Sequence, residues 1–164
     1  RLNSPNDVAV KSDGTIWFTD PVYGISNDYE GGRQSSEQPP ALYCFDPESG
    51  NIRAAASDFD GPNGLAFSPD ESRLYVAETG DQSTDRPKQC IRVFEVGEDG
   101  TLLEGSTFAK IEPGYCDGMT VDEDGNVWAS AGETVEVSSS INDGLRTADA
   151  GTRGILRKSK TLKS

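Results

Sequence analysis

The 164-residue sequence contains no histidine. Imidazole is therefore unavailable to any catalytic or metal-binding scheme, so the chemistry must rely on carboxylates, amides, hydroxyls, thiols or the backbone. Cysteine is also scarce: Cys44, Cys90 and Cys116 are an odd number and lack CxxC spacing. This pattern indicates neither a disulfide framework nor a zinc site. Because each cysteine lies in or beside an expected strand, we expect buried free thiols.

Basic residues and long apolar runs are few as well. Fifteen Lys or Arg stand against 28 Asp or Glu, which gives a formal net charge of −13. This balance argues against nucleic-acid binding, which requires a basic face. No apolar run approaches the length that spans a membrane, and no signal peptide is visible. We therefore expect no nucleic-acid or membrane partner, and no protein partner is evident.

One sequence pattern is present in three copies, which begin at Pro5-Asn6-Asp7, Pro62-Asn63-Gly64 and Cys116-Asp117-Gly118. In each copy an alternating apolar triplet follows, then a polar turn, then a second short apolar strand. The copies are about 55 residues apart, which is too long for leucine-rich or helical repeats and is typical of propeller blades. The sequence therefore predicts a radial array of small sheets.

We predict an all-β fold in which residues 1–137 form about three blades of a six-bladed β-propeller. A blade is a small four-stranded sheet that buries its faces only against neighbouring blades. Since the chain starts at Arg1, inside a blade, we expect a fragment of a longer protein. Uncovered faces and strand edges would make such a half-ring poorly stable. The compartment stays open, with the cytoplasm slightly favoured.

Outer hairpins and one long polar loop complete the expected blades. The loop at 21–40 is rich in Gly, Ser, Asn, Glu and Pro. Loops of this length in a compact domain are usually functional or disordered, and this one follows the first inner hairpin, where it could cover a pocket mouth. The expected outer strands cover residues 41–45, 52–56, 91–96 and 102–111, with a third strand of the last blade near 134–137.

The C-terminal segment has a different composition. Residues 141–164 carry six Lys or Arg against two acids, whereas residues 1–140 carry nine against 26. The segment also has almost no aliphatic periodicity, so we expect residues 138–164 to form an irregular, basic and disordered tail. A basic arm, a targeting tail, and a shifted reading frame or splice junction are the explanations left open.

The start of each inner strand is the candidate site. In a propeller these strands line a central channel, so equivalent positions in successive blades converge, and here they hold Asn6, Asn63 and Asp117. Two amide oxygens and one carboxylate suit Ca²⁺ or Mg²⁺ best, and Mn²⁺ or Zn²⁺ less well. The alternative is that these are ordinary turn residues, since Asn and Asp are common before Gly.

Four motifs in order resemble one known family. They are Asn3-Ser4-Pro5-Asn6-Asp7, Trp17-Phe18-Thr19-Asp20-Pro21-Val22-Tyr23-Gly24, the run from Pro62 to Asp70, and Asp117-Gly118-Met119 with Asp124-Gly125-Asn126-Val127-Trp128. Together they are similar to the gluconolactonase family, the SMP-30 and luciferin-regenerating-enzyme group of six-bladed propellers. The resemblance covers roughly residues 1–137 and does not extend into the tail.

The resemblance implies a divalent-metal-dependent hydrolase that opens sugar lactones. Asn63 and Asp117 would be metal ligands, Asp117 would also be the general base, and Asn6 would face the pocket and contact substrate or metal. A further metal-binding Glu belongs to an earlier blade in the family. The resemblance implies Ca²⁺ first, with Zn²⁺, Mg²⁺ or Mn²⁺ possible. Two alternatives remain, a phosphotriesterase or arylesterase on the same fold and a non-catalytic calcium-binding regulatory propeller.

Other residues are weaker candidates. The Asp122–Asn126 segment hints at a calcium loop, but it lacks EF-hand spacing and sits at a hairpin turn. Cys116 adjoins Asp117, but no histidine or other evident base would activate it as a nucleophile. Trp17 and Trp128 hold matching strand positions, which favours blade packing over a sugar-binding platform.

Overall fold

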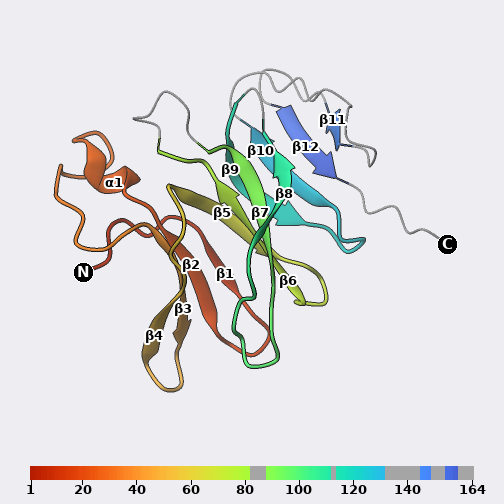
Figure 1. Ribbon diagram of the computed structural model, residues 1–164, viewed down its shortest axis with the longest axis horizontal. Helices are drawn as coiled ribbons and strands as arrows, with labels where there is room; N and C mark the ends of the chain where they lie inside the picture. Colours follow the sequence, from red (N-terminus) through yellow and green to blue (C-terminus); the bar gives the residue numbers. More distant parts are fainter. Residues whose placement is uncertain (82–87, 112–113, 132–144, 149–153, 159–164) are drawn as a thin grey trace.

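Short apolar strands alternate with Gly- and Asp-rich turns, and the chain folds into three four-stranded antiparallel sheets (Figure 1). The computed structural model describes residues 1–81, 88–111, 114–131, 145–148 and 154–158. The first sheet contains β1 (Val8–Val10), β2 (Ile16–Asp20), β3 (Ala41–Asp46) and β4 (Asn51–Ala56). The second contains β5 (Pro62–Phe67), β6 (Arg73–Glu78), β7 (Cys90–Glu95) and β8 (Ser106–Lys110). The third contains β9 (Cys116–Val121), β10 (Val127–Ala131), β11 (Leu145–Ala148) and β12 (Gly154–Lys158).

The three sheets are successive propeller blades. The first two are meanders in sequence order, and the third has the order β9-β10-β12-β11. The inner strands β1, β5 and β9 are consecutive neighbours, because β5 contacts both β1 and β9. The predicted all-β partial propeller is therefore confirmed, as are the inner hairpins and the outer hairpins of the first two blades.

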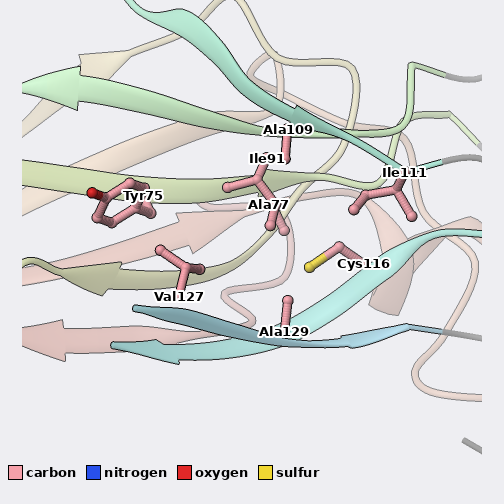
Figure 2. Packing of buried hydrophobic residues seen from close by; sticks show 8 residues of the cluster. All are labelled: Tyr75, Ala77, Ile91, Ala109, Ile111, Cys116, Val127 and Ala129. Carbon is pink, nitrogen blue, oxygen red and sulfur yellow. The ribbon is translucent and has the colours of Figure 1, made fainter. Parts of the chain in front are cut away.

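The apolar core lies between the blades. On β6, Leu74 and Val76 point into a cluster shared with the first blade, whereas Tyr75 and Ala77 point into a cluster shared with the third. Both faces of β6 are buried as a result, since successive side chains of a strand alternate between faces. Figure 2 shows the second cluster, in which residues of the second blade meet Cys116, Val127 and Ala129.

A turn contact adds a polar link between the first two blades. Glu71 adopts φ 56° at the turn place that Gly14 and Gly125 hold in the other blades with φ 87° and 80°. A left-handed backbone is costly for a residue with a Cβ. Here the Glu71 carboxylate accepts hydrogen bonds from the Ser12 backbone N–H at 2.7 Å and the Ser12 hydroxyl at 2.5 Å. The inter-blade contact accounts for a non-glycine residue at this position.

The structure differs from the sequence-based expectation in two segments. A four-residue helix, α1 (Tyr23–Ser26), lies inside the polar loop at 21–40. Strands β11 and β12 lie in the segment expected to be irregular, where β12 pairs with β10 from Val127↔Lys158 to Ala131↔Gly154. The open edge of β10 offers unpaired backbone groups, and pairing with such an edge does not require a strongly apolar segment. The strand expected near 134–137 lies outside the described residues.

Two further observations concern membrane-spanning helices and the cysteines. In the part of the chain that the structure describes, no helix has the length and apolar character needed to cross a membrane. The three cysteines are free thiols, of which Cys44 and Cys116 are buried and Cys90 is half-buried.

Candidate active site

The predicted site residues lie at an irregularity near the start of each inner strand. In β5, Pro62 pairs with Glu78 and Leu65 pairs with Val76, so Asn63 and Gly64 together face one residue of β6. The register between β9 and β10 shifts in the same way around Asp117 and Gly118. Such bulges bend a strand and re-aim its side chains, and they are common beside active sites.

The first blade has the corresponding arrangement just before β1. The Asn6 N–H donates to the Thr19 carbonyl at 2.9 Å, and the Thr19 N–H donates to the Asp7 carbonyl at 3.0 Å. Asn6 and Asp7 therefore both face Thr19 across the hairpin. The backbone thus follows a related path at all three positions that the sequence repeat aligned.

Hydroxyl groups at matching places stabilise two of the three bulges. The Ser130 hydroxyl accepts a hydrogen bond from the Gly118 N–H at 2.9 Å and lies 3.1 Å from the Gly118 carbonyl. The Thr19 hydroxyl accepts a hydrogen bond from the Asp7 N–H at 3.1 Å. Bulges leave such N–H groups outside the strand ladder, and these side chains satisfy them.

The structure brings Asn63 and Asp117 onto adjoining backbone. A Cβ placed on Gly64 would lie 2.4 Å from the Asp117 carbonyl oxygen and 2.8 Å from the Gly118 Cα. Only a glycine permits this approach of β5 to β9. Asn6 is linked to this pair less directly, because its neighbour Asp7 accepts a hydrogen bond from the Leu65 N–H at 2.9 Å.

Asn63 and Asp117 have opposite environments. The Asn63 side chain is buried, with 7% of its residue surface exposed, and it has no hydrogen-bond partner among the residues that the structure describes. Asp117 and Asn6 are exposed. A buried amide without a partner is unusual, because buried polar groups are normally hydrogen-bonded. An amide oxygen and a carboxylate on adjoining backbone are donor types that suit a hard divalent cation.

The described residues contain no group of three or more Asp, Glu, Cys or His that could hold a metal ion. A cation here would therefore take Asp117 as its carboxylate and complete its shell with amide oxygens, backbone carbonyls, water or a substrate. Ca²⁺ and Mg²⁺ both accept such mixed oxygen shells. The residues present fit a hard cation and provide no thiolate or imidazole for a soft one.

Two buried carboxylates that the sequence reasoning missed hold the segments leading into the inner strands. Asp20, at the end of β2, accepts hydrogen bonds from the Asn3 N–H at 2.9 Å and the Ser4 N–H at 2.8 Å. Glu78, at the end of β6, accepts one from the Gly61 N–H at 2.7 Å. Both acids end the second strand of their blade, so aligning that strand across the repeat could have found them.

Tyr23 and Thr79 connect the candidate residues across three blades. The Tyr23 hydroxyl, in α1, donates to the Gly61 carbonyl at 2.9 Å. Burial raises the pKa of Tyr23 to about 12, with the nearby Glu78 and Asp117 carboxylates adding to the rise. The Thr79 hydroxyl donates to the Cys116 carbonyl, directly before Asp117. Sequence reasoning missed both residues because neither belongs to the repeated pattern.

The weaker candidates have structural roles. Burial in the inter-blade core raises the pKa of Cys116 to about 12 (Figure 2), so this thiol is not an activated nucleophile. The Asp122 carboxylate accepts hydrogen bonds from the Asn126 amide and the Trp128 indole at 2.8 Å each, and these bonds stabilise the turn between β9 and β10. Trp17 is 1% exposed and packs edge-on against Phe67 of the next blade, as the blade-packing interpretation predicts.

A cavity of about 240 Å³ beside β7 and β8 lies apart from the inner strands. Its cationic side chains are already paired: Arg92 with Asp58 at 2.7 Å and Lys88 with Asp60 at 3.1 Å. Arg92 also stacks over the rings of Phe59 and Phe94. The cavity therefore gives no rival to the site at Asn63 and Asp117.

We predict that Gly64→Ala disrupts the junction of β5 with β9. The added methyl group would meet the backbone of Asp117 and Gly118, and overpacking of this kind costs about 1–3 kcal/mol of folding free energy. Thermal unfolding should therefore occur about 2–10 °C lower than in the wild type. Gly32→Ala is the matched control, because a Cβ on Gly32 meets nothing within 4 Å. Equal melting temperatures of the two variants would contradict the close approach.

Bulged inner strands with oxygen donors at their converging ends define a β-propeller with a candidate cation site. The chain matches the family described as SMP-30/Gluconolactonase/LRE-like region over residues 1–151. It therefore belongs to this family, and the match continues past residue 137, where the resemblance was expected to end.

Two relatives are gluconolactonases by name. The chain is 34% identical over 139 residues to a gluconolactonase of Zymomonas mobilis, covering 80% of this chain and 37% of that protein. The structure of a gluconolactonase from Xanthomonas campestris aligns with a TM-score of 0.72 at 40% identity, covering 82% of this chain and 43% of that one. The chain thus spans less than half the length of both proteins.

A third neighbour shares the fold alone. Regucalcin of Agrobacterium tumefaciens, described as a calcium-binding protein, aligns with a TM-score of 0.57 at 20% identity. The alignment covers 79% of this chain and 39% of that one. At this identity the similarity supports the propeller architecture and carries no argument about ligands.

Proposed function

We propose that the protein is a divalent-metal-dependent hydrolase that opens sugar lactones, with Asn63 and Asp117 as metal ligands. The observation that carries the proposal is the buried Asn63 amide, which has no hydrogen-bond partner among the described residues and lies on backbone that adjoins Asp117. The two relatives named gluconolactonase support the substrate class. Ca²⁺ is the proposed ion, because the donors are oxygen atoms and Ca²⁺ accepts a flexible coordination geometry, whereas Mg²⁺ demands a near-ideal octahedron.

The proposed reaction adds water to the lactone carbonyl carbon and breaks the bond between that carbon and the ring oxygen. A bound divalent cation polarises a carbonyl oxygen and stabilises the negative charge that develops on it. The Asp117 carboxylate would take one proton from the attacking water, and the ring oxygen would gain a proton as it leaves. The product is an open-chain hydroxy acid. The exposed Asn6 would bind the sugar hydroxyls.

The test measures acid release from a panel of aldonolactones at constant pH, with and without a chelator. The expected result is turnover that the chelator removes and that added Ca²⁺ restores. The matching aldonic acids have no lactone ring to hydrolyse, so they serve as blanks. Turnover that survives complete chelation would overturn the metal-dependent mechanism.

A second panel tests the alternatives on the same fold. Aryl esters and phosphotriesters are offered under identical conditions, and the ratio of their kcat/KM to that of the best lactone is measured. A ratio in favour of phosphotriesters or aryl esters would replace the lactone assignment. Ca²⁺ binding without turnover of any panel member would favour a non-catalytic calcium-binding propeller.

A further inference from the structure

Tyr23 is held firmly above the entry to β5. The Ser4 hydroxyl accepts a hydrogen bond from the Gly24 N–H at 3.1 Å and donates to the Pro21 carbonyl at 2.6 Å. These contacts fix the backbone on both sides of Tyr23. A tyrosine on a fixed backbone places its hydroxyl with little loss of side-chain entropy, because only two side-chain torsions remain.

The Gly61 carbonyl receives two hydrogen bonds. One comes from the Tyr23 hydroxyl at 2.9 Å and the other from the Thr79 N–H at 3.0 Å. A carbonyl oxygen has two lone pairs, so both of its acceptor positions are used. Gly61 stands two residues before Asn63, and its fixed carbonyl restrains the backbone that carries the Asn63 amide.

Thr79 makes the equivalent contact to the third blade. It is 4% exposed, and its hydroxyl donates to the Cys116 carbonyl, which belongs to the peptide bond that links Cys116 to Asp117. The Tyr23 hydroxyl and the Thr79 N–H both donate to the Gly61 carbonyl, so the two residues meet at that oxygen. A continuous polar chain therefore runs from the first blade, through the second, to the third.

We infer that Tyr23 and Thr79 are positioning residues, which hold the Asn63 backbone and the Asp117 backbone at a fixed separation for one cation. The inference rests on the proposed function. Hydrogen bonds behind the ligands of a metal orient those ligands, and loss of one such contact typically costs 10- to 100-fold in affinity. Neither hydroxyl has to touch the ion or the substrate.

The Tyr23 hydroxyl stays protonated throughout the neutral range. Burial raises its pKa to about 12, so it remains a hydrogen-bond donor at any pH at which the protein would work. The contact to the Gly61 carbonyl is therefore independent of pH between about 6 and 9. A Tyr23 variant should change cation affinity by the same factor at both ends of this range.

The experiment titrates Ca²⁺ into the protein by calorimetry and records thermal unfolding of the same samples without the ion. Tyr23→Phe and Thr79→Val each remove one hydroxyl, and each should weaken Ca²⁺ binding about 10-fold or more. Thr79→Ser keeps the hydroxyl and should stay within about threefold of the wild type. Tyr43→Phe is the control, because Tyr43 lies in β3 and stacks on Phe18.

The double variant separates a shared network from two independent contacts. If both hydroxyls act through one chain, the double variant Tyr23→Phe with Thr79→Val should lose less Ca²⁺ affinity than the product of the two single losses. The effects of substitutions within one network are not independent. An unchanged Ca²⁺ affinity of both single variants, with or without a lower melting temperature, would overturn the inference and leave these residues a purely structural role.

Failure of this inference is distinguishable from failure of the proposed function. Wild-type Ca²⁺ binding that is lost in Asp117→Ala but unchanged in Tyr23→Phe and Thr79→Val would refute positioning and leave the lactonase proposal intact. Weakened binding in these two variants without lactone turnover by the wild type would support positioning and refute the enzyme. Absence of wild-type Ca²⁺ binding would overturn both.

Discussion

Asp117→Ala is expected to remove calcium binding and lactone turnover together. Asp117 is the carboxylate of the proposed site, and its backbone adjoins Gly64 of the neighbouring blade. Loss of a direct ligand should weaken binding beyond the roughly 10- to 100-fold change that follows loss of an outer contact. The same side chain is the proposed general base, which contributes about 10²- to 10⁴-fold to the rate.

Asp117→Asn separates the two roles of this side chain. Asparagine keeps an oxygen ligand and nearly the same shape, so it should retain part of the calcium affinity. Its amide cannot take a proton from water, so the turnover of calcium-saturated Asp117→Asn should still fall by at least about 10²-fold. Calorimetry and acid release on the same samples measure the two effects.

Asp124→Ala is the control for this pair. Asp124 is an exposed acid in the turn between β9 and β10, at the other end of the same hairpin from Asp117. Its removal subtracts the same unit of charge from the hairpin without touching the bulge. A similar loss of calcium affinity in Asp124→Ala would show that net acidity, rather than Asp117, governs the binding.

Much of the fold could be predicted because the inner hairpins follow local rules. Alternating apolar residues and a Gly- or Asp-containing turn specify a hairpin from the nearest neighbours in sequence alone. The repeat places the apolar triplet of the second blade after Gly64, whereas β5 already begins at Pro62, which pairs with Glu78 across the bulge. Bulges add residues without changing composition, so they blur strand boundaries.

The missed elements depend on contacts that the local sequence does not express. Helix α1 has four residues, and the Ser4 hydroxyl holds its start through the Gly24 N–H. Strand β12 pairs with the open edge of β10, and that edge is visible only in three dimensions. Composition therefore gave a wrong prediction for Gly154–Lys158, whereas the apolar pattern predicted the inner hairpins correctly.

The candidate site was predictable only as far as the repeat reaches. Asn63 and Asp117 occupy equivalent positions, and radial geometry brings equivalent positions together. Tyr23 and Thr79 have no counterparts in the repeated pattern, so spacing alone could not join them to the site. The metal-binding roles of the first pair and the positioning roles of the second remain predictions for the experiments described above.

Glu78→Ala is expected to lower the stability of the protein strongly, because the Glu78 side chain holds the segment that leads into β5. It is 1% exposed and accepts hydrogen bonds from the N–H groups of Gly61 at 2.7 Å, Asp60 at 3.2 Å and Gly80 at 3.2 Å. Glu78→Ala would leave the buried N–H groups of Gly61 and Gly80 unsatisfied, at about 1–3 kcal/mol each. The free energy of unfolding in urea should therefore fall by about 3 kcal/mol or more.

Glu78→Gln tests the charge of this side chain through the pH dependence of stability. Burial raises the pKa of Glu78 above its ordinary value of 4.5. The folded protein then holds this proton more tightly than the unfolded chain does. Glu78 thus contributes stability that is fully present below pH 4.5 and is lost as pH rises through the folded-state pKa. The advantage of the wild type over Glu78→Gln should shrink across that interval.

Glu71→Gln gives the opposite sign and serves as the control. The hydrogen bond from the Ser12 hydroxyl lowers the pKa of Glu71, so its contribution is present above pH 4.5 and is lost as pH falls. All other acids, including Asp60 beside Glu78, are shared by the wild type and both variants and cancel in the differences. Parallel pH profiles for Glu78→Gln and Glu71→Gln would show that burial does not control the ionisation of Glu78.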